Sequence, residues 1–246
     1  MNEQKPVPQV AFNGSYSVHS IFHTIQGEGP FSGDAAVFVR LAGCNLQCPM
    51  CDTDYTSGER AARMTATEIC YQVIRLVRES ATRLVVITGG EPFRQDVFEL
   101  TDTLIAHGYN VQFETNGVLA PSDFFKTAFA TTWLKPACGV AIVVSPKASY
   151  VDEWISLNSI CYKYVLSHDS LADDGLPIEV LGRKSSQVAR PLLTSVQIYV
   201  SPADPVMLDS SSAALQREAN MRACVDSVQK HGYRMQLQIH KYLGVE

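Results

Sequence analysis

The sequence predicts an α/β fold, in which strands and helices alternate along the chain. Short runs rich in β-branched and aromatic residues recur, and several are continuously apolar, as expected of parallel strands covered on both faces. Amphipathic helical patterns separate several of these runs. No G-x-G-x-x-G follows the first strand, which weakens the dinucleotide-binding version of such a fold. A barrel-like (β/α) array and a doubly wound sheet both remain open at this point.

Seven runs are expected to form strands. Three of them contain the sequences VFVRL, LVVIT and AIVVS. The seven cover residues 36–41, 84–88, 111–115, 141–145, 162–166, 196–200 and 235–239.

The clearest helix is expected to begin at Thr65. Thr65 and Glu68 form a T-x-x-E capping box, and the apolar residues that follow recur at helical spacing. Two further helices are expected over residues 95–107 and 212–231. Each ends in His-Gly-Tyr, so we expect His107 and His231 to lie in the last helical turn and the following glycine to adopt the left-handed conformation.

Composition narrows the classes of protein that the chain can represent. It has 246 residues, 46% of them hydrophobic, and its charged fraction of 18% lies below the roughly 25% usual for soluble chains, which indicates a sizeable buried core. A net charge of -5 argues against a nucleic-acid partner. No apolar run approaches the ~18 residues that a membrane span needs, and no secretion signal begins the chain, so we expect a cytoplasmic protein without a membrane partner.

One domain is expected over residues 15–246. Residues 1–14 carry two prolines and little periodicity, and are expected to be a flexible extension. Residues 168–191 are polar and punctuated by glycine and proline, which predicts a surface insertion. Strand-like runs resume directly after it, so it marks no domain boundary.

Seven cysteines occur in the chain, and three of them fall within eight residues, at Cys44, Cys48 and Cys51. An odd number with this clustering is a poor disulfide framework but a plausible metal site. The trio follows the expected strand 36–41, and the carboxyl ends of strands are where α/β folds place their ligands. The other four are expected to be buried as small apolar side chains. They are Cys70, Cys138, Cys161 and Cys224.

The spacing of the trio is compatible with three kinds of site. Three thiolates can ligate three corners of a cubane iron–sulfur cluster and leave one iron open, whereas electron-transfer clusters normally take four cysteines. Structural zinc would need a fourth ligand from Asp52, Asp54 or a distant histidine. A redox Cys-x-x-Cys pair would leave Cys44 without a purpose. Spacing favours the cluster but leaves zinc open.

The trio also resembles the signature of the radical S-adenosylmethionine superfamily, C-x-x-x-C-x-x-C after the first barrel strand. A second motif, Thr88-Gly-Gly-Glu-Pro92, resembles the GGEP motif that ends the next strand in that superfamily. The resemblance implies a modified, incomplete (β/α) TIM-like barrel. It also implies that the open iron binds S-adenosylmethionine and that the cofactor supplies a 5′-deoxyadenosyl radical, so that no side chain acts as the catalyst.

Further motifs resemble one family, the 7-carboxy-7-deazaguanine synthases. They lie at residues 23–29, 38–44, 113–117, 144–147 and 238–246. The resemblance implies conversion of 6-carboxy-5,6,7,8-tetrahydropterin to 7-carboxy-7-deazaguanine with loss of ammonia, in queuosine and 7-deazapurine biosynthesis. It further implies a homodimer and a flavodoxin-like or other electron donor, with no direct contact to nucleic acid.

The family's binding residues map onto this chain through those motifs. A substrate carboxylate suits the bidentate guanidinium of Arg40, which otherwise has no evident partner within its apolar strand. The implied substrate contacts are Ile25, Gln26, Gly27, Glu28, Arg40, Thr88, His240 and the terminal carboxylate of Glu246. The implied S-adenosylmethionine contacts are Met50, Cys51, Asp52, Gly90, Glu91, Ser145, Pro146, Lys147, Ser201, Pro202, Ala203 and Asp204. A magnesium ion is implied at the Thr53 hydroxyl, consistent with the preference of Mg²⁺ for oxygen ligands.

One departure and two alternatives accompany this interpretation. The family often has Gln-Pro where this chain has Ser201-Pro202, which weakens the mapping of residues 201–204. A short radical enzyme that activates glycyl-radical partners would share the cysteine trio and GGEP but would not need residues 26–29, Thr53 or a substrate-binding carboxyl end. A zinc-stabilised interaction domain would share only the trio.

Overall fold

A computed structural model of the protein describes residues 5–49, 51, 61–135, 138–179, 187–205 and 209–245. Its strands are β1 Tyr16–Ile25, β2 Ala35–Leu41, β3 Ala62–Met64, β4 Leu84–Gly89, β5 Asn110–Thr115, β6 Leu134–Lys135, β7 Cys138–Val144, β8 Cys161–Leu166, β9 Gln197–Pro202 and β10 Arg234–Met235. Its helices are α1 Ala66–Leu76, α2 Phe98–Ala106, α3 Asp123–Thr131, α4 Glu153–Asn158, α5 Ser210–His231 and α6 Ile239–Leu243, with single 3-10 turns η1 Gly29–Phe31 and η2 Pro92–Arg94.

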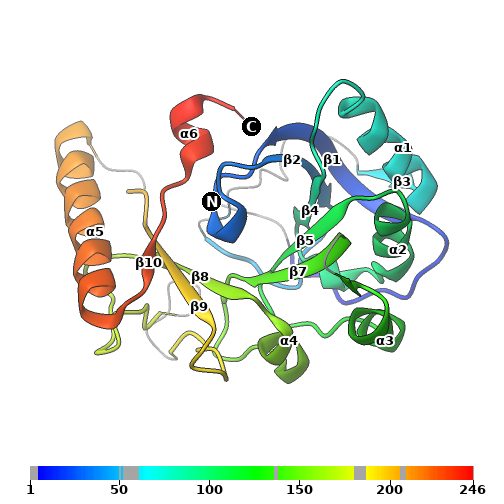
Figure 1. The fold of residues 1–246 in the computed structure, drawn as a ribbon. Coiled ribbons are helices and arrows are strands. Elements are labelled where there is room, and N and C mark those ends of the chain that lie inside the picture. Colours follow the sequence, from blue (N-terminus) through cyan, green and yellow to red (C-terminus); the bar gives the residue numbers. More distant parts are fainter. Residues whose placement is uncertain are drawn as a thin grey trace.

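Within the described ranges the strands form one ten-stranded sheet, in the order β10-β9-β8-β7-β5-β4-β2-β1-β3, with β6 paired to β7 off this path (Figure 1). Along this order the pairs from β2 through to β10 are parallel, whereas β1 runs antiparallel to both β2 and β3, and β6 runs antiparallel to β7. No described strand pair joins β3 to β10, so the sheet curls without closing. The α/β class and the incomplete barrel are thereby confirmed.

Six of the seven expected strands are confirmed as β2, β4, β5, β7, β8 and β9. The strand expected over 235–239 is wrong, because only Arg234 and Met235 pair with β9 and the chain turns into α6 at Ile239. The helix expected from residue 95 begins at Phe98, because Pro92–Arg94 forms a separate 3-10 turn.

The predicted helix ends are confirmed. The Thr65 hydroxyl accepts from the Glu68 amide at 3.2 Å, and the Glu68 carboxylate accepts from the Thr65 amide at 2.8 Å. His107 Nδ1 donates to the Thr103 carbonyl at 2.8 Å in the last turn of α2. His231 ends α5, and the glycine after it caps the helix in the left-handed conformation with φ of 75°.

Strand β1 was missed by the sequence analysis. Its ten residues alternate only loosely, because several of the polar side chains between Ser17 and Thr24 are half-buried rather than confined to one exposed face. A bulge between Val18 and Ser20 shifts its register against β2. The strand extends the parallel sheet by an antiparallel hairpin, which no motif in the chain indicates.

The two faces of the sheet differ in character. Helices α1 to α4 cover one face (Figure 1), and its residues, such as Val39 and Ile87, belong to the main hydrophobic core with Ile69 of α1 and Leu104 of α2. Side chains alternate between faces along a strand. The register therefore places a second set, rich in polar side chains, on the opposite, inner face. This set includes Ser20, Phe22, Phe38, Arg40, Thr88, Gln112, Glu114, Lys163, Tyr199 and Ser201.

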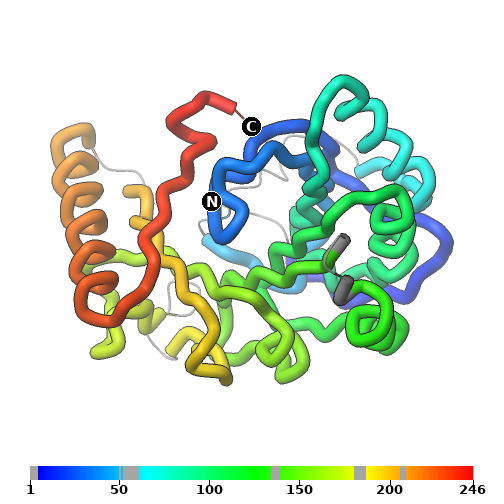
Figure 2. The backbone as a smooth tube through the Cα atoms, viewed as in Figure 1, coloured from blue at the N-terminus to red at the C-terminus, as the bar shows by residue number. Residues whose placement is uncertain are grey.

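The carboxyl-terminal segment bridges the open side of the sheet. In Figure 2 the red end of the chain passes back toward the blue amino-terminal strands. The Ile239 amide donates to the Gly27 carbonyl at 3.3 Å, and the Gly29 amide donates to Gln236 Oε1 at 2.6 Å. Contacts between loops therefore replace the strand pairing that would close a complete barrel.

Residues 7–10, expected to be part of a flexible extension, are hydrogen-bonded to the main body. The Val7 amide donates to the Cys44 carbonyl and the Val10 amide donates to the Arg94 carbonyl, both at 2.8 Å. The side-chain amide of Gln9 donates to the carbonyls of Phe93 and Ala120.

The described part of the expected insertion, residues 168–179 and 187–191, packs partly against α5. The Ser227 hydroxyl of α5 donates to the Gly175 carbonyl at 2.8 Å, and Arg190 pairs with Asp174 at 2.7 Å. Leu176 is buried, so the segment also contributes to the core. Among the described helices, none is both long enough and apolar enough to cross a membrane.

Candidate functional site

The sequence motifs meet at one edge of the sheet. The cysteine loop follows β2, the GGEP loop follows β4, the Asn116-Gly117 turn follows β5 and residues 145–147 follow β7. Because these strands are parallel, their carboxyl ends share one edge. The candidate site is therefore built from loops on a rigid sheet.

Two glycines let the GGEP loop lie directly on the cysteine loop. The Gly90 amide donates to the Leu41 carbonyl at 2.8 Å, and the Glu91 amide donates to the Gly43 carbonyl at 3.0 Å. A Cβ atom on Gly90 would stand 1.9 Å from the Gly43 carbonyl oxygen, and one on Gly89 would stand 2.2 Å from that of Leu41. Glycine is therefore required here by the packing of two backbones.

Glu91 connects the GGEP loop to the turn that follows β5. Its side chain is fully buried, and its carboxylate accepts from the Thr115 hydroxyl at 2.7 Å, the Asn116 amide at 2.8 Å and the Phe93 amide at 3.1 Å. Burial raises the pKa of this carboxyl to about 7, against the opposite effect of the three hydrogen bonds. The structure thus gives Glu91, expected to contact a cofactor ammonium group, a second role in joining the GGEP loop to the 115–117 turn.

The three cysteines of the trio are not in disulfide bonds and are partly exposed. The Leu46 amide donates to Cys44 Sγ at 3.4 Å, and Asn116 reaches the same loop through a 2.8 Å hydrogen bond to Asn45. Burial raises the pKa of Cys44 to about 11, and the neighbouring Cys48 and Cys51 add to the shift. A thiol with so high a pKa ionises readily only when a metal stabilises the thiolate.

The donor set fits an iron–sulfur cluster. Soft thiolates are the ligands that such clusters take, and an amide directed at a ligating sulfur is one of the contacts that tune them. In the described ranges, no three His, Cys, Asp or Glu side chains converge as they would around a single ion. A cubane places each of its thiolates on a different iron, so it does not require such convergence. Met50, Asp52, Thr53 and Glu246, predicted as further binding residues, lie outside the described residues.

Arg40 and Thr88 are neighbours on the inner face, paired in register on β2 and β4. The Arg40 guanidinium carbon lies 4.8 Å above the centre of the Phe22 ring. The expectation that Arg40 has no evident partner is therefore wrong, since a cation on an aromatic face is stabilised by the ring. The ring contacts one face of the guanidinium, and such a contact does not use the N–H donors.

A buried ion network on the inner face was missed by the sequence analysis. Lys163 Nζ lies 2.8 Å from Glu28 and 2.9 Å from Glu114, and Glu114 also accepts from Gln26 and Gln112. Burial would raise the pKa of Glu28, but the charge and hydrogen bond of Lys163 outweigh it and lower this pKa to about 2. The sequence does carry a signal for this network, namely a charged residue within the strand segments FET (residues 113–115) and YKY (residues 162–164).

His240 lies against the Gln26-Gly27-Glu28 segment. It lies in α6 rather than directly after a strand, and a Cβ atom on Gly27 would stand 2.0 Å from His240 Nδ1. Gln238 Nε2 donates to Glu28 at 2.5 Å. The glycine therefore makes room for the imidazole next to the buried ion network.

The remaining predicted cofactor residues lie on the same edge. Among residues 145–147, the Ser145 amide donates to the Thr115 carbonyl at 2.8 Å, and Ser201 is buried near the carboxyl end of β9. The predicted contact Asp204 forms an ion pair with Lys241. Pro146, Lys147, Pro202 and Ala203 are each placed beside these residues by the backbone.

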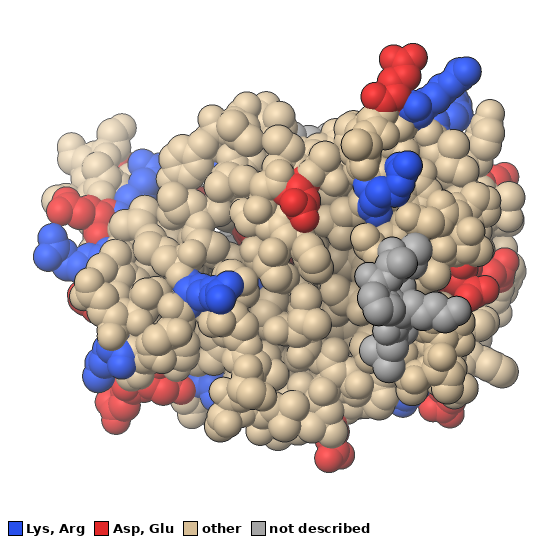
Figure 3. Space-filling model, in the orientation of Figure 1, with Lys and Arg blue, Asp and Glu red and all other residues tan. Residues whose placement is uncertain are grey.

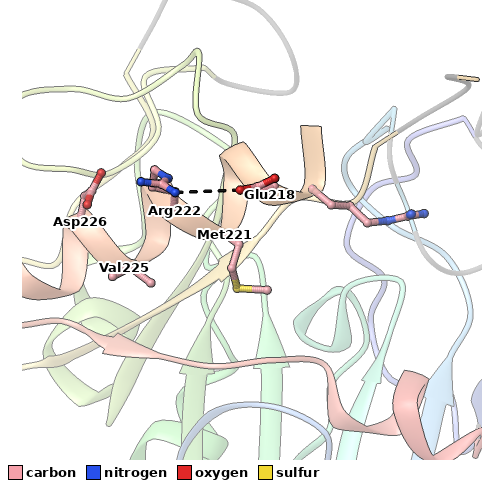
Figure 4. A pocket seen from close by; sticks show the side chains of 6 residues that line it. Glu218, Met221, Arg222, Val225 and Asp226 are labelled. Atoms are coloured by element: carbon pink, nitrogen blue, oxygen red, sulfur yellow. Dashed lines mark ion pairs between the residues drawn. The ribbon is translucent and has the colours of Figure 1, made fainter. Parts of the chain in front are cut away.

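Two surface hollows lie elsewhere and contain no candidate site residue. One, of about 460 Å³, runs along α5, where Glu218 and Arg222 pair at 3.9 Å beside Met221 (Figure 4). The other, of about 470 Å³, lies between α5 and residues 168–175. On the face drawn in Figure 3, charged side chains of both signs are scattered over a mostly uncharged surface.

An incomplete α/β barrel whose strand-end loops bring a cysteine trio against a GGEP turn defines a radical S-adenosylmethionine protein, and residues 39–128 match the sequence model of the Radical SAM superfamily. Two relatives called 7-carboxy-7-deazaguanine synthase match most of the chain. The Rhodospirillum rubrum protein is 37% identical over 237 residues, covering 93% of this chain and 92% of its own length. The Rickettsia prowazekii protein is 32% identical over 93% of this chain and 88% of its own length.

The chain belongs to the 7-carboxy-7-deazaguanine synthase family. A crystal structure of QueE from Escherichia coli shares the fold, with a TM-score of 0.61 at 24% identity over 90% of this chain and 92% of that one. Family membership decides against the two alternatives, the glycyl-radical activase and the zinc-stabilised interaction domain.

Proposed function

We propose that this protein converts 6-carboxy-5,6,7,8-tetrahydropterin to 7-carboxy-7-deazaguanine with release of ammonia, in queuosine or 7-deazapurine biosynthesis. The observation that carries the proposal is the contact of the cysteine loop with the GGEP loop, directly beside an inner face that presents Arg40, Thr88 and a buried ion network. Relatives named for this reaction match the chain over 93% of its length.

The cofactors would be held by the loops at the carboxyl edge of the sheet. Cys44, Cys48 and Cys51 would ligate a [4Fe–4S] cluster, and S-adenosylmethionine would lie among Met50-Asp52, Gly90-Glu91, residues 145–147 and residues 201–204. When bound, the cluster and S-adenosylmethionine would together supply a 5′-deoxyadenosyl radical that abstracts a hydrogen atom. No side chain is needed as the catalyst, so the protein contributes position and exclusion of water.

The substrate would lie against the inner face and the mouth formed by residues 25–28. Arg40 would bind the pterin carboxylate through two parallel hydrogen bonds while the Phe22 ring holds its plane. The Thr88 hydroxyl, one strand away, would fix the opposite edge of that carboxylate or of the ring. Around it, Ile25 to Glu28, His240 and the terminal carboxylate of Glu246 would read the remaining donors and acceptors of the ring system.

Lys163 would keep the Glu28 carboxylate, at the mouth formed by residues 25–28, ionised and paired. Its one positive charge pairs with both Glu28 and Glu114 and offsets half of their negative charge, so a neutral pterin ring meets carboxylates that are already hydrogen-bonded. Such preorganisation lowers the cost of ordering the site when substrate binds.

Three further parts of the proposal rest on the family alone. They are the magnesium ion at the Thr53 hydroxyl, a homodimer and a flavodoxin-like electron donor. Sequence patterns favour two more, one domain over residues 15–246 and a location in the reducing cytoplasm, where thiols persist.

The test is an anaerobic assay of the reconstituted protein with the carboxytetrahydropterin, with and without magnesium. We expect 7-carboxy-7-deazaguanine and ammonia in equal amounts. The Thr53→Ala variant is expected to lose most of the magnesium stimulation, while Thr131→Ala, which removes an exposed hydroxyl bonded only within α3 and to its neighbour, keeps it. A protein that holds its cluster, cleaves S-adenosylmethionine and yields no deazaguanine would refute the proposal.

A further inference from the structure

Arg94 lies between the amino-terminal segment and the cysteine loop. Its side chain is buried, with the residue only 8% exposed. Nη1 donates to the Pro8 carbonyl at 3.2 Å and Nη2 donates to the Ala42 carbonyl at 3.0 Å. Its own carbonyl accepts from the Val10 amide at 2.8 Å. One side chain therefore joins residues 8–10 to the start of the cysteine loop.

The guanidinium packs on the backbone that leads into Cys44. A Cβ atom on Gly43 would stand 2.7 Å from Arg94 Nε and Nη2, and Gly43 has a φ of 85°, which side-chain-bearing residues rarely adopt. The segment on the far side of Arg94 reaches the same loop, because the Val7 amide donates to the Cys44 carbonyl at 2.8 Å. Cys44 is thus held from two directions.

The charge of Arg94 is not balanced by a carboxylate in the described part of the chain. Burial lowers its pKa, and the acidic group that acts in the opposite direction is the Cys44 thiol. Its Nε–H is buried without an acceptor among the described residues. A buried cation is costly unless an anion lies near it.

We propose that Arg94 is a positioning residue of the cofactor centre, which supplies the counter-charge at the Cys44 corner of the cluster and ties residues 7–10 over the cysteine loop. This inference rests on the proposed function in one respect, that the trio ligates a [4Fe–4S] cluster. A cluster held by three thiolates is anionic, and each added electron makes it more so. A fixed cation beside it stabilises the reduced form and raises the reduction potential.

The test compares Arg94→Lys, which keeps the charge, with Arg94→Gln, which keeps hydrogen-bond donors without the charge. Iron and sulfide content is measured first. The cluster is then reduced stepwise with dithionite, and the fraction reduced is followed by electron paramagnetic resonance. One electron passes from dithionite to the cluster, and no bond is broken. We expect Arg94→Gln to shift the one-electron reduction equilibrium at least tenfold toward the oxidised form, about 59 mV more negative. Arg94→Lys is expected to stay closer to the parent protein.

Loss of the cluster from Arg94→Gln but not from Arg94→Lys would also support the proposal, since the cluster would then require the positive charge at residue 94. Equal reduction potentials in the parent protein and both variants, or equal loss of the cluster from the two variants, would overturn the proposal that Arg94 supplies the counter-charge. Pterin turnover is scored separately. A parent protein that binds the cluster and makes no deazaguanine fails the proposed function while the shift in potential still stands.

A separate pair of variants tests the contact between residues 7–10 and the cysteine loop. Val7→Pro removes the N–H that the Cys44 carbonyl accepts, whereas Val7→Ala retains it. We expect the visible absorbance of the cluster to bleach in air several-fold faster in Val7→Pro than in Val7→Ala. Equal bleaching rates in these two variants and the parent protein would overturn the tie.

Discussion

Lys163 on β8 bonds Glu114 on β5 across the intervening strand β7, with Nζ 2.9 Å from the carboxylate, and the same ammonium lies 2.8 Å from Glu28 beyond the end of β1. The ammonium is buried on the inner face and the two carboxylates are half-buried there, where a lone charge would be unstable. Their mutual pairing is what allows a polar interior to exist in a small barrel, and it makes the network sensitive to the loss of any one member.

Replacing Lys163 with Met is expected to lower the free energy of unfolding by ~3–5 kcal/mol, because two half-buried carboxylates lose the buried cation that pairs with both of them. Anaerobic urea unfolding measures this. Lys126→Met is the matched control, since the Lys126 pair with Asp123 is exposed and should contribute less than about 1 kcal/mol. A Lys163→Met cost as small as that of the control would show that the network does not stabilise the fold.

Acid should weaken the fold through Glu28. Its pKa is about 2 in the folded protein and near 4.5 when unfolded, so the unfolded state binds the proton first and the stabilisation from the ionised group is lost as pH falls from 4.5 toward 2. We expect the Glu28→Gln variant to show a shallower decline of unfolding free energy over this range. Glu218→Gln, on the exposed surface of α5, should match the parent slope; an identical slope for Glu28→Gln would contradict the assignment.

Adding one methyl group at Gly90 should separate the GGEP loop from the cysteine loop. The new Cβ would collide with a backbone carbonyl, which cannot rotate away as a side chain can. We expect Gly90→Ala to weaken S-adenosylmethionine binding at least tenfold in equilibrium dialysis of the cluster-loaded protein. Gly139→Ala is the control, because its nearest neighbouring atom stands 4.0 Å away. Unchanged binding in Gly90→Ala would mean that the loops can part without consequence.

Arg40→Met should raise the KM for the pterin by roughly 10- to 100-fold, the loss expected for hydrogen bonds to a charged group, with a smaller effect on kcat. The control Arg83→Met removes an exposed guanidinium beside the start of β4. Steady-state kinetics under anaerobic conditions separate the two constants. A fall in kcat alone would place Arg40 away from the substrate carboxylate.

Much of the fold was predictable because buried parallel strands leave a local trace. Runs such as VFVRL and LVVIT have few alternatives to a covered strand, and the capping box at Thr65 fixes where α1 begins. Strand β1 left no such trace, since its pairing with β2 depends on a partner that the local sequence does not specify. The strand expected over 235–239 failed for a similar reason, because strand pairing ends after two residues.

The motif residues of the candidate site were predictable because cysteine spacing and paired glycines are local patterns. The ion network was not, since Lys163 and Glu28 are 135 residues apart and meet only through the register of the curled sheet. Arg94 was missed for a related reason. Its partners Pro8 and Ala42 are distant carbonyl groups, and an arginine after GGEP gives no sign that it will be buried.

The open barrel also bears on β-pairing between copies of the chain. An unclosed sheet has two edges whose unpaired amide and carbonyl groups could recruit strands from other copies. Here the edges end in β3 and β10, of three and two residues, and the chain leaves each within a few residues. At β3 and β10 an incoming strand therefore finds only one or two hydrogen bonds, which limits cross-molecular β-pairing at these two strands while leaving the mouth of the barrel wide.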